Sequence, residues 1–242
     1  MINQNSLILQ KLQGNLVVSC QALEDEPLHG AMIMGRMALA AQNGGAAGIR
    51  ANSVEDICEI KRQVNLPLIG IIKKEYGDSE IYITPTMEEI TALLATPAEI
   101  IGMDATKRRR PFGASLRELL DAVKQAGKLA LADVSDREEG IEAEAMGFDI
   151  VSTTLSGYTP YTLGRKKPDI SLVRELALQL KIPVAAEGNI RKPEELIECL
   201  RQGASFAIIG GAITRPQNIT QTFVGAIAKW KGEEPDESVC CR

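Results

Sequence analysis

The stretch RQGASFAII at residues 201–209 decides the fold, because a glycine ends a helical segment and an apolar run follows at once. The same order recurs in QNGGAAGIR at residues 42–50, KQAGKLALAD at 124–133 and EAMGFDIVS at 144–152. Glycine commonly closes helices, and continuously apolar runs are typical of parallel strands that are buried on both faces. The chain is therefore predicted to alternate helices with buried strands.

Eight apolar runs rich in β-branched residues lie along the chain, with helical segments between them. Two of these segments, at residues 53–64 and 115–126, begin with a serine that can cap a helix and repeat apolar residues at helical spacing. Eight βα units in 242 residues favour an α/β fold, a single (β/α)8 TIM barrel. An open, doubly wound sheet is the alternative, but no GxGxxG motif follows the first run. The predicted strands cover residues 16–21, 47–51, 66–73, 99–105, 128–134, 148–155, 182–187 and 205–213.

The two ends of the chain lie outside this pattern. Residues 1–14 are predicted to form a short N-terminal helix that plugs the N-terminal end of the barrel. Residues 1–230 are expected to make up one catalytic barrel domain, because a chain of this length can bury a single core. Residues 231–242 are polar apart from two cysteines and are predicted to be a disordered tail.

The composition is that of a folded chain without a generally basic surface. Hydrophobic residues make up 45% and charged residues 24%, which excludes intrinsic disorder for most of the chain. The formal net charge of −5 argues against general binding of nucleic acid or anionic membranes, since both need a basic surface. We therefore expect no nucleic-acid partner and no membrane partner.

The cysteine and histidine content bears on the cellular compartment and on the chemistry. Five cysteines without a CxxC pair are a poor disulfide framework, and neither an export signal nor a run of 18 apolar residues is found. A cytoplasmic protein is expected. His29 is the single histidine, so a His-rich transition-metal site is impossible, and its place before a predicted helix favours a structural role.

The predicted strands end in polar residues, at the end of the barrel where active sites of this fold lie. Lys73 follows a strongly apolar run, so burial is expected to lower the pKa of its amine to about 7 or 8, the range of a useful general base. Glu187 would serve as an acid or as a hydrogen-bond partner, and Arg50 would stabilise oxyanion charge. The polar strand ends are Gln21, Arg50, Lys73, Asp104, Asp133 and Glu187.

Glycines follow the last two predicted strands, at Gly188 and at the pair Gly210 and Gly211. Loops at these places in barrels commonly bind phosphate through backbone N–H groups, and Arg215 would add a charged contact. This pattern predicts a small phosphorylated substrate whose proton is abstracted beside a carbonyl, as in isomerisation or epimerisation of a sugar phosphate. Lys73 would equally suit Schiff-base formation in a lyase or aldolase, and a non-catalytic sugar-phosphate sensor is a third interpretation.

Six segments of the chain resemble the N-acetylmannosamine-6-phosphate 2-epimerase family, and the resemblance covers about residues 21–230. Two segments in the same order, TTLSGYT within residues 152–162 and GGAITRP at 210–216, are the most specific. The six segments are GIIKKEYGDSEIYITPT (70–86), GMDATKRRRP (102–111), LADVS (131–135), STTLSGYTPYT (152–162), AAEGNI (185–190) and GGAITRP (210–216).

The resemblance implies a (β/α)8 barrel that interconverts N-acetylmannosamine 6-phosphate and N-acetylglucosamine 6-phosphate in amino-sugar and sialic-acid catabolism, without a metal or an organic cofactor. It implies that Lys73 moves the proton at C2 of the opened sugar and that Glu187 assists. Asn189 stands where family members often carry arginine. A homodimer is a further expectation. The substrate-binding residues are then Gln21, Arg50 and Asp133 for the sugar and N-acetyl oxygens, and Gly188, Asn189, Gly210, Gly211 and Arg215 around the phosphate.

Overall fold

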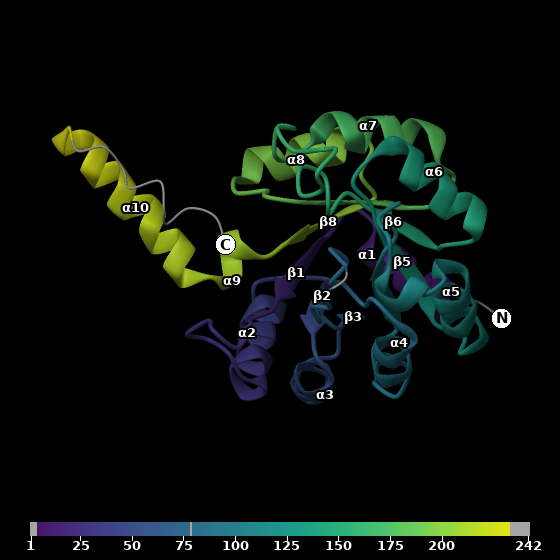
Figure 1. The fold of residues 1–242 in the computed structure, drawn as a ribbon. Coiled ribbons are helices and arrows are strands. Elements are labelled where there is room, and N and C mark those ends of the chain that lie inside the picture. Colours follow the sequence, from purple (N-terminus) through teal and green to yellow (C-terminus); the bar gives the residue numbers. More distant parts are fainter. Residues whose placement is uncertain (1–3, 78, 233–242) are drawn as a thin grey trace.

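Eight parallel strands form a closed barrel in the computed structural model, which describes residues 4–77 and 79–232 (Figure 1). The strands are β1 (Leu16–Cys20), β2 (Gly48–Asn52), β3 (Leu68–Ile71), β4 (Ile100–Asp104), β5 (Leu129–Asp133), β6 (Ile150–Ser152), β7 (Val184–Glu187) and β8 (Phe206–Ile209). They follow one another around the barrel in sequence order, and β8 pairs with β1 to close it. The predicted (β/α)8 barrel is confirmed.

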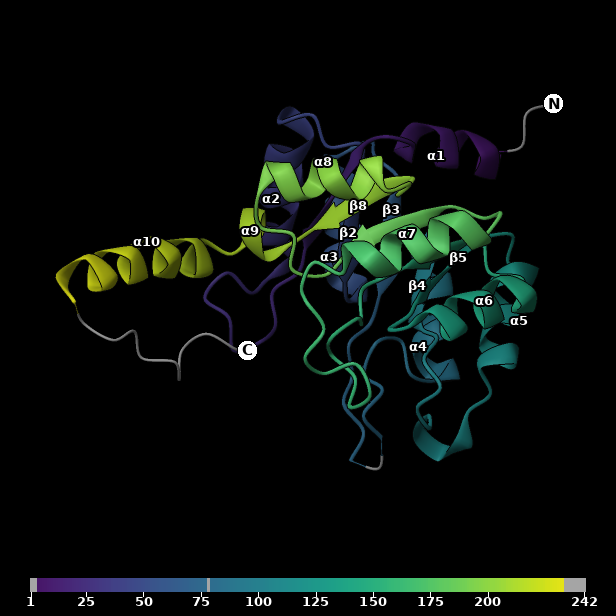
Figure 2. The same ribbon diagram turned by 90° about the horizontal axis from the view of Figure 1, so that it is seen from above.

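At least one helix follows each strand, and most of these helices cover the outside of the barrel (Figures 1 and 2). Ser53 and Ser115 cap two of them as predicted, because their side chains accept hydrogen bonds from the backbone N–H groups of Asp56 and Glu118. The helices are α1 (Gln4–Leu12), α2 (Ala31–Asn43), α3 (Val54–Gln63), α4 (Met87–Leu94), α5 (Leu116–Gln125), α6 (Arg137–Met146), α7 (Ile170–Gln179), α8 (Pro193–Arg201), α9 (Gly211–Thr214) and α10 (Pro216–Lys231), with a 3-10 turn at Pro111–Gly113.

The N-terminal helix α1 closes one end of the barrel. Ile8 and Leu12 are buried against inward-facing strand residues, among them Val17, Ile69 and Leu129. The predicted N-terminal plug is therefore confirmed for residues 4–12. Because this end of the barrel is filled with apolar side chains, a polar site can form only at the carboxyl ends of the strands.

Strand side chains alternate between the interior and the outer face, and this alternation fixes which of them reach the site. In β5, Leu129 and Leu131 belong to the interior cluster, whereas Ala130 and Ala132 pack against the helices. Asp133 is the next inward residue and is fully buried. The inward rows thus change from apolar to charged along the strand direction.

The last strand is shorter than predicted. The predicted run of residues 205–213 is wrong beyond Ile209, because Gly211–Thr214 form helix α9. Short apolar runs do not distinguish a strand from a helix, and here the Thr214 hydroxyl fixes the turn by donating to the carbonyl of Ser19 at 2.9 Å. Residues 233–242, most of the predicted disordered tail, lie outside the described residues, and Lys231 still belongs to α10.

Helix α10 projects away from the barrel, as Figures 1 and 2 show from two directions. None of its residues is buried. Four of its large apolar side chains are exposed, and Trp230 is the most exposed of them at 85%. No helix within the described ranges is both long and apolar enough to cross a lipid bilayer.

Candidate active site

Arg50 lies at the centre of the polar end of the barrel and pairs with two carboxylates. Nη1 lies 2.8 Å from Asp133 Oδ1 and 2.6 Å from Glu187 Oε2, and Nη2 lies 2.7 Å from Asp133 Oδ2. Burial lowers the pKa of Arg50, but the charges of Asp133 and Glu187 outweigh it and raise the pKa. The structure thus brings together three predicted residues from β2, β5 and β7, with Arg50 permanently charged.

Gly102 on β4, the strand beside β5, makes room for the Arg50 guanidinium and its two carboxylates. A Cβ at Gly102 would lie 2.9 Å from Ile71 Cγ2 and 3.8 Å from Arg50 Nη2. Since contacts under 3.0 Å force a neighbour to move, a larger residue would disturb the interior beside the guanidinium. Asp104, at the end of the same strand, instead pairs with Arg108 at 2.6 Å, outside the Arg50 cluster.

Glu187, the last residue of β7, is also held by hydroxyl groups. Its Oε2 accepts hydrogen bonds from Thr154 Oγ1 at 3.0 Å and from Ser152 Oγ at 3.3 Å. Burial and then the charge of Asp133 raise the pKa of Glu187, while Arg50 and the Thr154 hydroxyl oppose the rise. The shift favours the protonated form, so Glu187 is suited to donate a proton to a ligand.

Lys73 follows β3 on the inward row of Ile69 and Ile71. Its backbone N–H donates to Asn52 Oδ1 at 2.8 Å, which fixes the main chain as it leaves the strand. Burial lowers the pKa of the Lys73 amine to about 8, and the charges of Arg215 and Arg50 contribute to the decrease. The sequence predicted this direction and its main cause, because the preceding strand is entirely apolar.

The neighbouring Lys74 faces the other way. Its Nζ lies 2.8 Å from Glu88 Oε1 and 3.5 Å from Glu89 Oε1, both on α4. The side-chain hydrogen bond to Glu88 raises the pKa of Lys74. Strand alternation thus separates two adjacent lysines into an inward amine that is easily deprotonated and an outward one that stays charged.

The segment between β3 and α4 folds back on itself as a small hairpin. Lys73 pairs with Ile83 and Tyr76 with Ser79 in antiparallel bridges. The available sequence signal was Gly77, a turn residue between two stretches of strand-forming residues. Tyr82 stands on the returning arm, and burial, then the charges of Asp133 and Asp104, raise the pKa of its phenol.

The predicted phosphate loops have strained or glycine-dependent backbones. Gly188 and Asn189 have φ angles of 115° and 58°, in the left-handed region that glycine and asparagine tolerate best. Asn189 Oδ1 accepts a hydrogen bond from Arg191 Nε at 2.8 Å. Gly210 and Gly211 form the start of α9, where the first N–H groups of a helix have no intrahelical partner.

Two other predicted ligand-binding residues have protein partners. Arg215 forms a two-point ion pair with Glu26 of the loop between β1 and α2, at 2.7 and 2.8 Å. Gln21 is buried, and its Nε2 donates to Ser19 Oγ at 2.7 Å. The charge of Arg215 acts on Lys73, which links the predicted phosphate loop to the predicted base.

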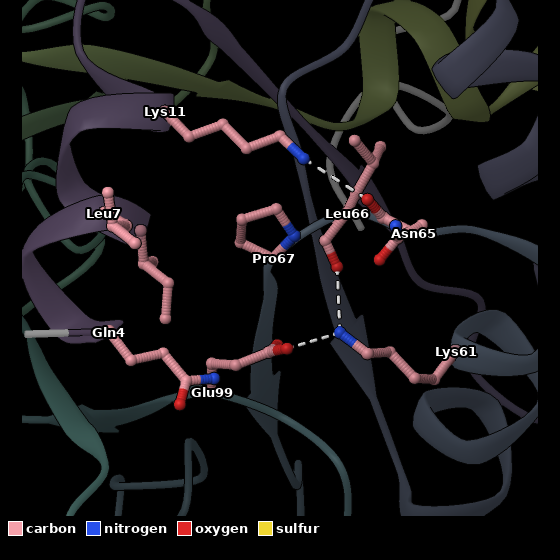
Figure 3. Close-up of a pocket in the computed structure, with 9 residues that line it drawn as sticks. Gln4, Leu7, Lys11, Lys61, Asn65, Leu66, Pro67 and Glu99 are labelled. Atoms are coloured by element: carbon pink, nitrogen blue, oxygen red, sulfur yellow. Dashed lines mark hydrogen bonds and ion pairs between the residues drawn. The ribbon is translucent and has the colours of Figure 1, made fainter.

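A cavity of about 190 Å³ lies at the opposite end of the barrel, beside α1 (Figure 3). Its two lysines already have protein acceptors: Lys11 donates to the carbonyl of Asn65, and Lys61 pairs with Glu99. None of the predicted site residues lines this cavity. The strand ends, and not this cavity, therefore carry the candidate active site.

A family model described as "Putative N-acetylmannosamine-6-phosphate epimerase" matches residues 34–229. The chain belongs to this family. A putative N-acetylmannosamine-6-phosphate 2-epimerase of Clostridium perfringens (strain SM101) is 59% identical over 216 residues, 89% of this chain and 98% of that protein. The corresponding protein of Clostridioides difficile (strain 630) is 54% identical over 220 residues, 91% of this chain and 99% of that one.

A solved structure of the N-acetylmannosamine-6-phosphate 2-epimerase from Clostridium perfringens has the same architecture. It superposes with a TM-score of 0.89 at 58% identity, over 90% of this chain and 95% of that chain. The resemblance found in the sequence segments is therefore confirmed. In this epimerase-family chain, no group of three or more His, Cys, Asp or Glu side chains among the described residues is arranged to hold a metal ion.

Sequence reasoning missed several polar residues of the site in this member of the epimerase family. Ser152 and Thr154 lie within the STTLSGYTPYT segment, where inward alternation after β6 was the available signal. Glu26 lies in an acidic loop, beside Glu24 and Asp25, and gave no signal. Tyr82 lies in the unpredicted hairpin.

Proposed function

We propose that the protein interconverts N-acetylmannosamine 6-phosphate and N-acetylglucosamine 6-phosphate in amino-sugar and sialic-acid catabolism. Family membership supports this activity. The observation that carries it is the amine of Lys73, whose pKa is lowered to about 8 on the inward row that leads to Arg50 and Glu187. An amine of this kind is a suitable base for a proton beside a carbonyl.

In the proposed reaction, the neutral amine of Lys73 removes the proton from C2 of the opened sugar. The electron pair of the broken C–H bond moves toward C1, and the charge collects on the carbonyl oxygen. Glu187, protonated in its buried site, donates a proton to the other face of C2 as the charge leaves the oxygen, which gives the epimer. Exchange with water then removes the proton from Lys73 and returns one to Glu187. Arg50 holds Glu187 and Asp133 in place and keeps positive charge near the enolate.

The other predicted contacts are part of the same proposal. Gln21 and Asp133 are assigned to the sugar and N-acetyl oxygens. The phosphate is assigned to the N–H groups around Gly188, Asn189, Gly210 and Gly211, with Arg215 beside them. The left-handed backbone at residues 188–189, directly after β7, and the glycines directly after β8 support this assignment, because they lie at the strand ends where barrels of this fold commonly bind phosphate.

Incubation with N-acetylmannosamine 6-phosphate in deuterium oxide tests the proposal. Proton NMR should show conversion together with loss of the C2 proton signal. A folded protein that gives neither result would exclude the epimerase. If borohydride instead traps substrate mass on Lys73, the protein is a Schiff-base lyase or aldolase.

We also propose that the protein is a homodimer in which α10 of each chain packs on the barrel of the other. In a (β/α)8 barrel, the helix after β8 lies between α8 and α2. Instead α10 leaves the barrel at Arg215, the one residue between α9 and α10. The helices around the place expected for α10 expose apolar side chains, which are Ile33 on α2, Ile197 on α8 and Ile213 on α9. One face of α10 also exposes apolar side chains, which are Phe223, Val224, Ile227 and Trp230.

The free energy of burying these side chains supports a second copy as the occupant. Four large apolar side chains gain roughly 6–12 kcal/mol when they are fully buried. A second copy offers the matching surface, and a one-residue connection favours exchange over folding back. Light scattering should give twice the chain mass, and Ile227→Glu should give a monomer. The cross-linking test uses chains that carry Cys240→Ser and Cys241→Ser. When Ile227→Cys chains are mixed with Ile197→Cys chains in this background, a disulfide should form between chains. A monomeric wild-type protein contradicts the proposal.

We further propose that the protein works in the cytoplasm. Cys20, Cys58 and Cys199 are free thiols in the structure, and such thiols persist in reducing compartments. Fractionation of the source cells tests the location, and recovery in an extracellular fraction would contradict it.

A further inference from the structure

Thr154 lies where one hydroxyl group touches both carboxylates of the site. It follows the end of β6 on the inward row of Ile150 and Ser152. Its Oγ1 lies 2.5 Å from Asp133 Oδ1 and 3.0 Å from Glu187 Oε2. A third contact, at 2.8 Å, joins Oγ1 to Ser152 Oγ.

The two carboxylates therefore share two donors. Arg50 Nη1 contacts both of them, at 2.8 and 2.6 Å, and so does the Thr154 hydroxyl. A hydroxyl group carries a single donor hydrogen, so Thr154 can donate to only one carboxylate at a time. Because the pair is buried and has one cation for two negative charges, a single shared proton relieves the repulsion within the cluster.

The geometry distinguishes the two carboxylates. Asp133 receives two hydrogen bonds from Arg50 and the shorter contact from Thr154. Glu187 receives one bond from Arg50, and 15% of its side chain is exposed, against 0% for Asp133. Asp133 thus has more hydrogen-bond donors, and the shared proton belongs on Glu187, the more exposed of the two carboxyls.

We propose that Thr154 is a positioning residue: by donating a hydrogen bond to Asp133, it directs the shared proton to Glu187. This inference depends on the proposed epimerase activity in one respect: Glu187 is taken to be the proton donor to the substrate. Other charged or titratable groups also face the pair and are part of the same balance. They are Arg50 on β2, Lys73 after β3 and Tyr82 on the hairpin, and the neutral hydroxyl of Ser152 on β6 also donates to Glu187.

Replacement of the hydroxyl by a methyl group tests the assignment. In Thr154→Val, the ionised pair loses a donor, so the apparent pKa of the pair should rise by about one unit. The turnover number should fall about twofold, with little change in KM, because the proton is then divided between the two carboxyls. Thr154→Ser should restore both values, and Thr154→Ala should repeat the valine result if valine does not fold.

Carbon-13 NMR of labelled carboxyl groups in the substrate-free protein measures the titration independently of turnover. Signals are assigned with Glu187→Gln and Asp133→Asn. The matched control is Thr153→Val, because the Thr153 hydroxyl bonds the backbone of Glu187, at 2.8 and 3.1 Å, and not its carboxylate. That control should keep the wild-type titration.

A Thr154→Val protein that titrates like the wild type, or a shared proton assigned to Asp133 in the wild type, would overturn the role of Thr154. Failure of the wild-type protein to epimerise its substrate would contradict the proposed function instead, and would leave the titration result standing.

Discussion

Arg215 and Glu26 form a side-on ion pair, with Nε 2.7 Å from Oε2 and Nη2 2.8 Å from Oε1. Glu26 is itself fixed, because its Oε1 accepts the N–H of Leu23 at 3.2 Å. The guanidinium is thus held by two of its three nitrogens, and Nη1 is the remaining one. This geometry orients one edge of Arg215 for an anionic ligand.

The first prediction concerns Arg215 itself. Arg215→Met should raise KM for the phosphorylated substrate about 10- to 100-fold, since a charge-assisted contact to phosphate is lost. The turnover number should change much less. The matched control is Arg201→Met, whose parent side chain is 72% exposed on α8. Steady-state kinetics measure both constants, and an unchanged KM would remove Arg215 from the phosphate site.

The second prediction separates the two adjacent lysines. Lys73→Met should lower the turnover number about 10²- to 10⁴-fold, the usual contribution of a general base. Lys74→Met should retain most of the activity, because Lys74 pairs with Glu88 on the outside. Substrate binding by Lys73→Met, measured by calorimetry, should persist. Equal losses in both variants would contradict the assignment.

The third prediction is the pH dependence of the reaction. Lys73 must be neutral to accept a proton, and its pKa is about 8. Activity measured as kcat/KM should therefore rise with pH, tenfold per unit, and should level off once Lys73 is neutral or Glu187 loses its proton, whichever comes first. An activity that falls as pH rises through this range would mean that the charged amine is the active form.

The fourth prediction links the same group to stability. The folded protein binds the Lys73 proton more weakly than the unfolded chain does, because the pKa falls from 10.5 to about 8. The free energy of unfolding therefore gains a contribution as pH rises from about 8 to 10.5 and lacks it below pH 8. Lys73→Met removes the buried charge and should stabilise the fold at pH 7 by about 1–3 kcal/mol. Urea unfolding measures this, and a destabilised variant would contradict it.

The fifth prediction concerns the buried ion cluster. Arg50→Met leaves Asp133 and Glu187 without their cation and should lower the free energy of unfolding by about 3–5 kcal/mol at neutral pH. Adding Asp133→Asn to that variant should recover part of the loss, because the unpaired charge of the cluster is removed. Arg62→Met serves as a control, since Arg62 is 81% exposed. Unchanged stability in Arg50→Met would show that the cluster is not a structural unit.

Most of the barrel and several site residues could be predicted from the sequence, because both follow from local patterns. Apolar runs located all eight strands, and the polar residues at their ends included Arg50, Asp133 and Glu187, which the structure brings together. Glycines after β7 and β8 marked the loops with unusual backbone conformations. These features depend on neighbours in the sequence.

The remaining features depend on contacts between distant segments. The pairing of Arg215 with Glu26 joins residues 189 positions apart, and no local pattern indicates it. The apolar residues after Gly210 were read as strand because helix and strand look alike over four residues. Helix α10 leaves the barrel at Arg215, and its own sequence does not specify that direction.

Trp230 is the single tryptophan of the chain and lies near the end of α10, 85% exposed. The intrinsic fluorescence of this protein therefore originates far from the barrel. The wavelength of maximum emission depends on the surroundings of the indole on that one helix. It is longer when water surrounds the indole and shorter when another protein surface covers it. A denaturation experiment that follows this signal would therefore report changes around α10. Unfolding of the barrel alone would leave the signal unchanged.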